Sequence, residues 1–375
     1  MILSPRRKEN KVNYDKNSTK HYDYLVECAK KAAAEEKENP CYTADLLYAL
    51  CRYFTDCGKP AAHADALCKN LLSKIKDFDE NAPESVRLFA KAARAIYAFY
   101  KISSDENAKK SAECIFHILV NGSEVSADKQ NNPALKEEYC GAIYAVSELY
   151  KFDKDKAVDF AMKNLALLSD ENYKFSSAIC AVNGAIGLLN ISQITPEPFQ
   201  IVLFAAKKIA AENKNLDYTF NRSFIEEKPL ADPAVTSLLM AFYTALYKRC
   251  GDRFYLYMAR RIWFNGMQFF LRNGGFVGYN NPPVAPEGIL SVATYEEKTL
   301  TPLFTEGLCT YEKDKELFAE YDAPVKKDPR GRYIVDDKVF ARELGEYFGR
   351  DLIEIPSLLS FDEETAKGFK FRLLF

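Results

Sequence analysis

Residues 176–192 read SSAICAVNGAIGLLNIS, a stretch of the chain without a charged side chain. Its Ala, Ile, Val, Gly and Leu residues fall on every side of a helix rather than on one face. In a globular protein, a helix that is apolar all round is buried on all sides. The stretch therefore predicts a central helix that other helices surround.

The middle of this stretch recurs in related form along the chain. The related segments are Leu46–Ala49, Ala95–Ala98, Ala142–Ala145, Ala178–Ala181 and Ala241–Thr244. Each lies in the first member of a pair of helical segments, and these pairs are 43–55 with 61–78, 84–102 with 105–120, 134–151 with 154–168, 175–190 with 197–213, and 233–250 with 253–272. A loose repeat of helix pairs predicts a stacked or closed helical array.

The two helices of each pair differ in character, because the first is apolar in its middle and the second keeps a Lys/Glu face. Inner apolar helices alternating with outer amphipathic ones predict a mainly α fold, an α/α toroid of six helical hairpins over residues 20–350. The sixth pair would join 336–347 to 21–38. The alternative is an open array, which would expose its inner helices along a groove. In a toroid, Tyr97, Tyr144, Cys180 and Tyr243 lie inside, and Lys156, Lys163 and Lys208 lie outside.

Outside the helical pairs the sequence changes. Residues 1–19 are polar without a period and predict a surface arm. A Gly-, Pro- and Asn-rich region at about 273–335 predicts loops, with short strands at 289–295, 299–305 and 332–335 that make a small β-rich segment near the C-terminus. Residues 351–375 are expected to pack on the toroid.

Composition narrows the classes of partner and location. The 51 basic and 53 acidic residues give a net charge of −2, and this near-neutrality argues against nucleic acid as the main partner. Neither a secretory signal nor a membrane span is visible in the sequence. Ten cysteines without a C-x-x-C motif predict reduced thiols in the cytoplasm, and three histidines leave little room for a multi-His metal site. We therefore expect no cofactor, while a homodimer stays open.

Carboxylates at helix starts are the candidate catalytic groups. Asp232 precedes Pro233 at the start of a first helix, and Glu138 opens another. Both positions also suit a purely structural role, since Asp is a good N-cap and acidic residues stabilise the first turn of a helix. Glycosidic bond cleavage needs two carboxyl groups, one as acid and one as base or nucleophile. In a closed toroid, Asp232 and Glu138 would converge at the mouth of the ring. Glu306, in the irregular region expected to rim the mouth, is a further candidate, with a place at a strand edge as the alternative.

Aromatic and amide side chains near residue 270 are the candidate sugar-binding groups. Trp263 and Tyr279 have rings that can stack on a sugar face, and Asn281 can bond its hydroxyls. For both rings the alternative is a place in the core, which the helical spacing favours for Trp263 more than for the loop residue Tyr279.

One segment resembles a known family. The run Gly251–Tyr255 through Arg260, then Phe264-Asn265-Gly266 and the later Phe276, Tyr279, Asn281 and Pro282, resembles a segment of the bacterial β-L-arabinofuranosidase family of glycoside hydrolases. The resemblance implies an α/α toroid and an enzyme of sugar chemistry. The family's E-x-C motif falls here on Asp232-Pro233-Ala234, so the thiolates that hold its zinc ion are missing. The resemblance therefore supports the fold more than the activity.

These observations lead to two hypotheses of different classes. The first is a glycoside hydrolase that acts on small oligosaccharides through carboxylates at the toroid mouth, with a small carbohydrate as ligand. The second is a non-catalytic helical-repeat protein that binds a peptide or partner on its concave face. A closed ring with an acidic cavity favours the enzyme, whereas an open superhelix with a long groove favours the scaffold.

Overall fold

The computed structural model describes most of the predicted helical region. The described residues are 21–35, 39–76, 85–122, 132–214, 218–225, 230–267 and 302–319, with short strand segments at 271–272, 275–276, 291–292, 325–327 and 333–335. The predicted arm at 1–19, the helix at 336–347 and the segment 351–375 lie outside the described residues.

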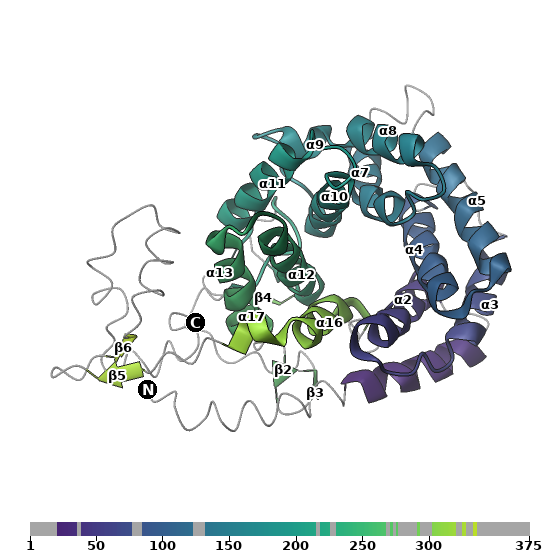
Figure 1. Cartoon of the computed structure of the whole chain (residues 1–375), viewed down its shortest axis with the longest axis horizontal. Helices are drawn as coiled ribbons and strands as arrows, with labels where there is room; N and C mark the ends of the chain where they lie inside the picture. The colour runs from purple at the N-terminus through teal and green to yellow at the C-terminus, as the bar shows by residue number, and fades with distance from the viewer. Residues whose placement is uncertain are drawn as a thin grey trace.

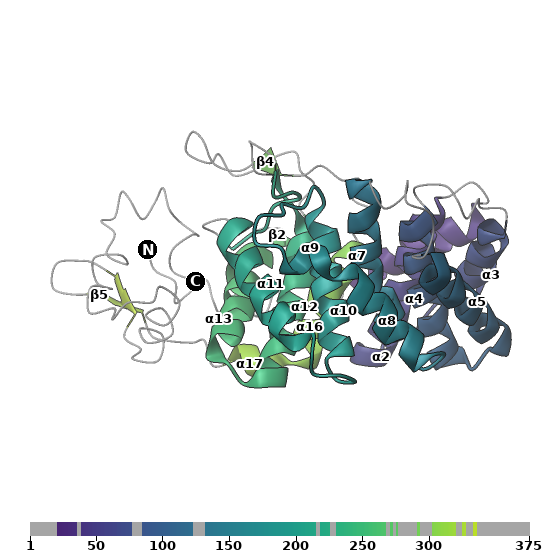
Figure 2. The same cartoon turned by 90° about the horizontal axis from the view of Figure 1, so that it is seen from above.

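The described helices form two concentric rings (Figure 1). The inner ring consists of α2 (Pro40–Cys57), α4 (Ser85–Ser103), α7 (Pro133–Glu148), α10 (Ala178–Ile191), α12 (Pro233–Cys250) and α16 (Thr305–Lys313). Around it lie residues 21–34, α3 (Ala64–Ile75), α5 (Glu106–Gly122), α8 (Lys154–Asn164), α9 (Ala166–Ser169), α11 (Phe199–Glu212) and α13 (Arg253–Arg261). The helices run along the ring axis rather than around it (Figure 2).

The ring is closed. Each inner helix contacts the next one along the chain, and α16 contacts both α12 and α2. The fold is therefore the predicted α/α toroid and not an open array. The five helix pairs expected between residues 43 and 272 are present, although two bounds differ from the prediction. Helix α2 starts earlier because Asn39 caps it, and the last helix ends before residue 271, where strand β2 begins.

The last inner helix was not predicted. Residues 299–305 were expected to form a strand, but 302–303 are helical and Thr305 begins α16. Leu308 and Cys309 are fully buried there between α12 and α2. This prediction was wrong because packing in the gap of the ring outweighs the local preference for a strand.

The described strands are short. β1 (Leu230–Ala231) pairs in parallel with β4 (Ser291–Val292), while β2 (Leu271–Arg272) with β3 (Gly275–Phe276) and β5 (Val325–Lys327) with β6 (Tyr333–Val335) form antiparallel pairs. Within the described residues each sheet has two strands of two or three residues. The small β-rich segment predicted near the C-terminus is therefore not supported.

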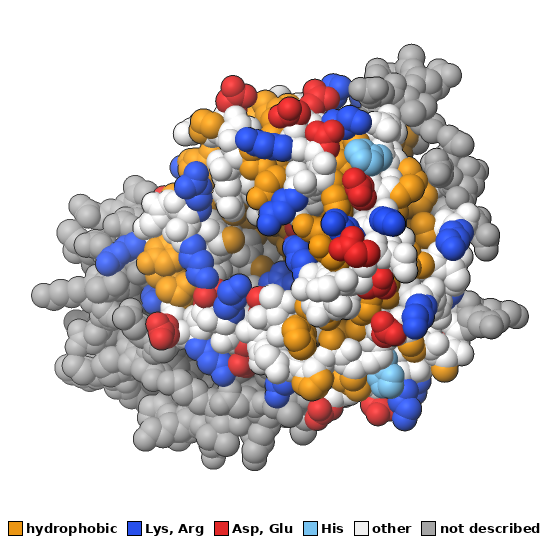
Figure 3. All heavy atoms as spheres, turned by 45° about the vertical axis from the view of Figure 1, so that its right-hand side comes forward, with side chains coloured by type: hydrophobic (Ala, Val, Ile, Leu, Met, Phe, Trp, Pro, Cys, Tyr) orange, Lys and Arg blue, Asp and Glu red, His pale blue; other side chains and the backbone are white. Residues whose placement is uncertain are grey.

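The predicted alternation of burial is confirmed. Tyr97, Tyr144, Cys180 and Tyr243 are all buried. Lys156 and Lys163 are exposed, and Lys208 is half-buried with its ammonium group bonded to the carbonyl oxygens of Asp170 and Tyr173. Basic and acidic side chains are mixed over the face that carries α3, α5 and α8 (Figure 3). In the described part of the chain, no helix is both long and apolar enough to span a membrane.

Helices α10 and α7 approach each other through glycine. A Cβ atom added at Gly187 would lie 2.5 Å from the carbonyl carbon of Ile143 and the backbone nitrogen of Tyr144. At Gly141, on α7, an added Cβ would lie 3.3 Å from the Cα of Cys180. Because the obstacle at Gly187 is backbone, the two helices can keep their spacing only if this position has no side chain.

We predict that Gly187→Ala lowers the free energy of unfolding by about 2–3 kcal/mol, since the extra methyl group forces α10 away from α7. Gly141→Ala is the matched control at the same interface, and its stability should stay within about 1 kcal/mol of the parent because Ala also favours the helix. Urea unfolding of the three proteins measures the difference. Equal stability of the two variants would contradict the close backbone packing.

His21 joins the first described helix to the last inner one. Its ring is 2% exposed, and Nε2 lies 3.4 Å from the hydroxyl oxygen of Thr305 at the start of α16. The ring also packs against Tyr53 of α2, with ring centroids 5.9 Å apart. Burial lowers the pKa of His21 from 6.5 to about 3, so the imidazole is neutral in the folded protein at neutral pH.

This lowered pKa predicts a loss of stability in mild acid. Below pH 6.5 the unfolded chain takes up a proton on His21 that the folded protein does not accept until about pH 3, so stability falls as the pH falls through this window. Between pH 7.5 and 5.5, above the range in which carboxylates titrate, the loss should be about 1.4 kcal/mol. Urea unfolding of His21→Gln should show a smaller loss of stability over the same pH range. His63→Gln, at an exposed position, should lose as much stability as the parent. The same pH dependence in His21→Gln and the parent would refute the assignment.

Candidate functional site

A cavity of about 590 Å³ opens at one end of the inner ring. Its lining includes Asn39, Asp45, Arg87, Glu138, Ser177 and Asp232, which lie at or near the starts of α2, α4, α7, α10 and α12. The inner helices thus point their N-terminal ends at the same space. This end of a helix carries a partial positive charge and unpaired backbone N–H groups, so polar side chains gather there.

Side-chain caps fix two of these helix starts. The Oδ1 atom of Asn39 accepts a hydrogen bond from the backbone N–H of Cys41 at 2.8 Å. The Oδ1 atom of Asp232 accepts from Ala234 at 2.8 Å and from Val235 at 3.1 Å. Asp232 is therefore an N-cap, as one of its two interpretations predicted, and it also lines the cavity.

A side chain of the neighbouring helix α7 fixes the start of α10. The buried carboxylate of Glu137 accepts hydrogen bonds from the backbone N–H groups of Ser176, at 2.7 Å, and Ser177, at 2.9 Å. It also accepts bonds from the hydroxyl groups of Ser176 and Tyr173. Glu137 thus positions the segment that enters the cavity wall, a role beyond the charge–dipole interaction expected for a first-turn acid.

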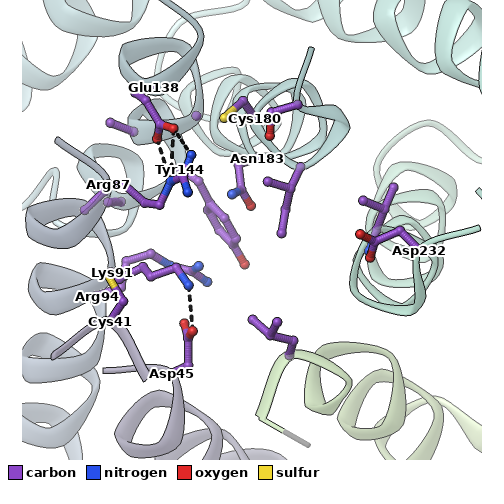
Figure 4. A pocket seen from close by; sticks show the side chains of 18 of the residues that line it. Cys41, Asp45, Arg87, Lys91, Arg94, Glu138, Tyr144, Cys180, Asn183 and Asp232 are labelled. Atoms are coloured by element: carbon purple, nitrogen blue, oxygen red, sulfur yellow. Dashed lines mark hydrogen bonds and ion pairs between the residues drawn. The ribbon is translucent and has the colours of Figure 1, made fainter. Parts of the chain in front are cut away.

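One wall of the cavity carries paired charges. Arg87 and Lys91 project from α4 at helical spacing. The guanidinium group of Arg87 contacts both oxygens of Glu138, with Nε at 3.0 and 3.1 Å from them. The ammonium group of Lys91 lies 2.6 Å from Asp45 of α2. Glu138 and Asp45 therefore each have a basic counter-ion at the cavity surface (Figure 4).

A further Arg of α4 lies at the floor of the cavity. The guanidinium carbon of Arg94 is 3.6 Å from the ring centroid of Tyr144 and 4.2 Å from that of Tyr48. Its nitrogens bind Glu148 of α7 at 3.0 Å and Glu306 of α16 at 3.2 Å. Cation–π contacts and two ion pairs therefore fix Arg94, and with it the ring of Tyr144.

The two catalytic candidates at helix starts share one cavity. Asp232 lies on α12, across the open space from Glu138 and the basic residues of α4 (Figure 4). The structure thus brings together Asp232 and Glu138, as the sequence predicted for a closed ring.

The other candidates have different positions. Glu306 lies in the first turn of α16 and binds Arg52 at 2.8 Å as well as Arg94, so it belongs to the ion pairs inside the ring. Trp263 is 2% exposed and stacks on Tyr311 at 3.8 Å between centroids, which places it in the core, the alternative that its spacing allowed. Neither residue lines the cavity. Tyr279 and Asn281 lie outside the described residues.

Thiol and imidazole groups offer little chemistry at the cavity. Cys41 and Cys180 line it, but burial raises the pKa of both thiols, that of Cys180 to about 12. A thiol is nucleophilic only as the thiolate. His21, His63 and His117 all lie away from the cavity lining. Among the residues that the structure describes, no group of three or more His, Cys, Asp or Glu side chains is placed to bind a metal ion.

The basic wall has a signal in the sequence that the candidate carboxylates and aromatic residues do not include. Arg87, Lys91 and Arg94 lie at i, i+4 and i+7 in a helix whose repeat position marks it as an inner one. Three basic residues on one face of an inner helix require acidic partners or a polar cavity. The segment therefore indicated where the carboxylates of neighbouring helices would gather.

The position of Glu306 predicts a structural role. Glu306→Gln should lower the free energy of unfolding by about 2–4 kcal/mol, somewhat less than a fully broken buried ion pair, because Arg52 and Arg94 keep Asp56 and Glu148 as partners. Lys69, exposed on α3, pairs with Asp65, and Asp65→Asn is the control that should cost less than about 1 kcal/mol. Chemical unfolding tests both. An unchanged stability of Glu306→Gln would remove the structural role and return Glu306 to the catalytic candidates.

The fold is shared with solved carbohydrate enzymes. No family model matches the chain, and neither does a curated protein sequence. An unsaturated glucuronyl hydrolase specific for heparin has a TM-score of 0.55 at 12% identity, with 80% of this chain and 98% of that one covered. A cellobiose 2-epimerase from Bacillus thermoamylovorans has a TM-score of 0.51 at 13% identity, with 72% and 88% covered. A β-arabinofuranosidase of glycoside hydrolase family 127 has a TM-score of 0.51 at 14% identity, with 80% and 57% covered. These likenesses confirm the toroid that the sequence resemblance implied.

Proposed function

We propose that the protein is a carbohydrate-active enzyme, a glycoside hydrolase, whose small oligosaccharide substrate enters the cavity at the N-terminal ends of the inner helices. The observation that carries the proposal is the placement of Asp232 and Glu138 in one cavity, on different helices. Its volume of about 590 Å³ falls in the usual range of small-ligand sites. The printed names of the similar structures, which include hydrolases and an epimerase of sugars, agree with a sugar substrate.

The pairing of charges assigns the two roles. Hydrolysis requires an ionised carboxylate, as base or nucleophile, and a carboxylic acid that protonates the leaving oxygen. Glu138 has Arg87 against both of its oxygens, so it suits the ionised role. We assign Asp232 the role of proton donor as the second carboxyl group of the cavity, and the proton must then be on Oδ2, because Oδ1 accepts the two capping hydrogen bonds. The histidines lie away from the cavity, and the thiols of Cys41 and Cys180, which line it, stay protonated because burial raises their pKa. Carboxyl groups are therefore the acid and base that we propose for this chemistry.

The geometry of the ring disfavours the scaffold alternative. A helical-repeat binding protein uses a long concave groove formed by an open superhelix. Here α16 contacts both α2 and α12, which closes the ring around a cavity of small-molecule size.

We also propose that the protein works in the cytoplasm. All ten cysteines are free thiols in the structure, and four of them are exposed or half-buried. Exposed and half-buried thiols persist in a reducing compartment, whereas secreted proteins commonly pair theirs.

The proposal predicts that Asp232→Asn keeps the fold and abolishes glycosidase activity. Asn caps a helix about as well as Asp, so the melting temperature should hardly change. A neutral amide cannot donate the proton, and general acid–base catalysis is typically worth about 10²–10⁴-fold in rate. Thermal melting and hydrolysis of a panel of aryl glycosides measure the two effects.

Asp252→Asn is the matched control. Asp252 caps α13 through a 2.9 Å bond to the backbone N–H of Phe254, but it does not line the cavity. Its activity should equal that of the parent. Full activity in Asp232→Asn would exclude the catalytic role, and absence of turnover by the parent on every glycoside would contradict the proposed function.

A further inference from the structure

The charged groups of the cavity are almost all neutralised within the protein. Arg87 pairs with Glu138, Lys91 with Asp45, and Arg94 with Glu148 and Glu306. Arg222 lines the cavity from an exposed position. An anionic group deep in the cavity would compete with existing carboxylates for every one of the α4 cations. The floor is therefore suited to an uncharged ligand group.

Two neutral polar side chains differ from this paired set. Tyr144 of α7 and Asn183 of α10 both line the cavity. Figure 4 shows the Tyr144 hydroxyl and the Asn183 amide directed into the same open space. Within the described part of the chain, no hydrogen bond joins the Tyr144 hydroxyl or the Asn183 amide to another protein group, and neither is among the buried polar atoms that lack a partner, as expected for groups that face an open cavity. Their bonding capacity is thus available to a molecule in the cavity.

The Tyr144 hydroxyl is held in place. The Arg94 guanidinium covers one face of its ring, and Arg94 is itself fixed by Glu148 and Glu306. Burial, with the nearby charge of Glu306, raises the pKa of Tyr144, so the phenol remains a hydrogen-bond donor at any working pH. The ring face under Arg94 is not available for stacking, and the hydroxyl is directed into the cavity (Figure 4).

Asn183 is fixed by its helix. It lies one residue before Gly184, where an added Cβ would meet the Sγ atom of Cys140 at 2.7 Å, and four before Gly187, where α10 touches the backbone of α7. This close packing sets the distance between α10 and α7, and so the distance between Asn183 and Tyr144. The amide offers a donor and an acceptor side by side, which matches two adjacent hydroxyl groups of a sugar ring.

We propose that Tyr144 and Asn183 recognise a neutral sugar unit at the floor of the cavity, by hydrogen bonds to its ring hydroxyls. The inference rests on the proposed function and adds the residues that bind the substrate and the charge class of the unit they bind. A site that bonds a hydroxyl discriminates strongly against analogues that lack it, because its own polar groups are then left unpaired.

The experiment measures binding and not turnover, so that it is independent of the catalytic residues. The probes are the methyl glycosides of arabinofuranose, xylose, glucose and galactose, with methyl glucuronide and methyl galacturonide as the charged counterparts of the last two. Calorimetric titration of the parent identifies the probes that bind. Tyr144→Phe and Asn183→Ala are then titrated with the tightest neutral probe and with its monodeoxy analogues.

Each variant has a matched control. Tyr97→Phe removes a hydroxyl from a buried Tyr of α4 that does not line the cavity, and Asn190→Ala removes an amide from α10 further from the mouth. We expect about 3- to 10-fold weaker binding for Tyr144→Phe and about 10-fold for Asn183→Ala, with parent affinity in both controls. For the deoxy analogue that lacks the contacted hydroxyl, Tyr144→Phe and the parent should bind equally. Melting temperatures verify that all four variants are folded.

The outcomes separate the two proposals. Parent affinity in Tyr144→Phe and Asn183→Ala would overturn the recognition pair while leaving the hydrolase intact. A uronide that binds more tightly than its neutral counterpart would overturn the neutral charge class. Binding of a probe without cleavage of any aryl glycoside would refute the hydrolase and leave the recognition pair standing on its own data. If no probe binds and no glycoside is cleaved, both proposals fail.

Discussion

The double ion pair of Glu306 is the contact on which the ring depends. Glu306 lies on α16 and binds Arg52 of α2 and Arg94 of α4, residues 254 and 212 positions earlier in the chain. Bringing such distant segments together costs chain entropy, which grows slowly with their separation. The three side chains are between 10% and 23% exposed, so their attraction is less screened than at the surface. The same carboxylate thus fixes Arg94 and, together with the burial of Leu308 and Cys309, holds α16 in the ring.

A second constraint follows from the common direction of the inner helices. Because α2, α10 and α12 begin at the same end of the ring, their caps Asn39, Ser177 and Asp232 all line one cavity. Asn39 and Asp232 satisfy the first backbone N–H groups of α2 and α12 through their own side chains, and Glu137 of α7 accepts from the backbone at the start of α10. The fold therefore concentrates carboxylates, amides and hydroxyls at one mouth for a purely structural reason, and chemistry can use the groups already there.

The common direction of the inner helices explains which parts of the fold and of the candidate site could be predicted from the sequence. Residues 176–192 predicted a buried helix because they contain no charge, and the helix-start positions of Asp232 and Glu138 predicted a shared mouth once a closed ring was assumed. Glu306 was not predictable as an ion-pair partner, because α16 is only 9 residues long and its partners lie far away in sequence. The roles of Tyr144 and Asn183 were also hidden, since a Tyr or Asn in an inner helix looks the same whether it faces the core or a cavity.

Asp232 shows how a structural role and the proposed catalytic role can coincide in this fold. Its Oδ1 atom accepts hydrogen bonds from two backbone N–H groups, and these bonds hold the carboxyl group in its orientation toward the cavity. A catalytic group held by the scaffold reacts faster than a mobile one, because its orientation costs no entropy at the transition state. The cap interaction that stabilises α12 therefore also aims the proposed acid, just as the Arg94 network that closes the ring also aims Tyr144. The contacts that stabilise the ring, the Asp232 cap and the Arg94 ion pairs, are therefore also the contacts that position the side chains of the candidate site.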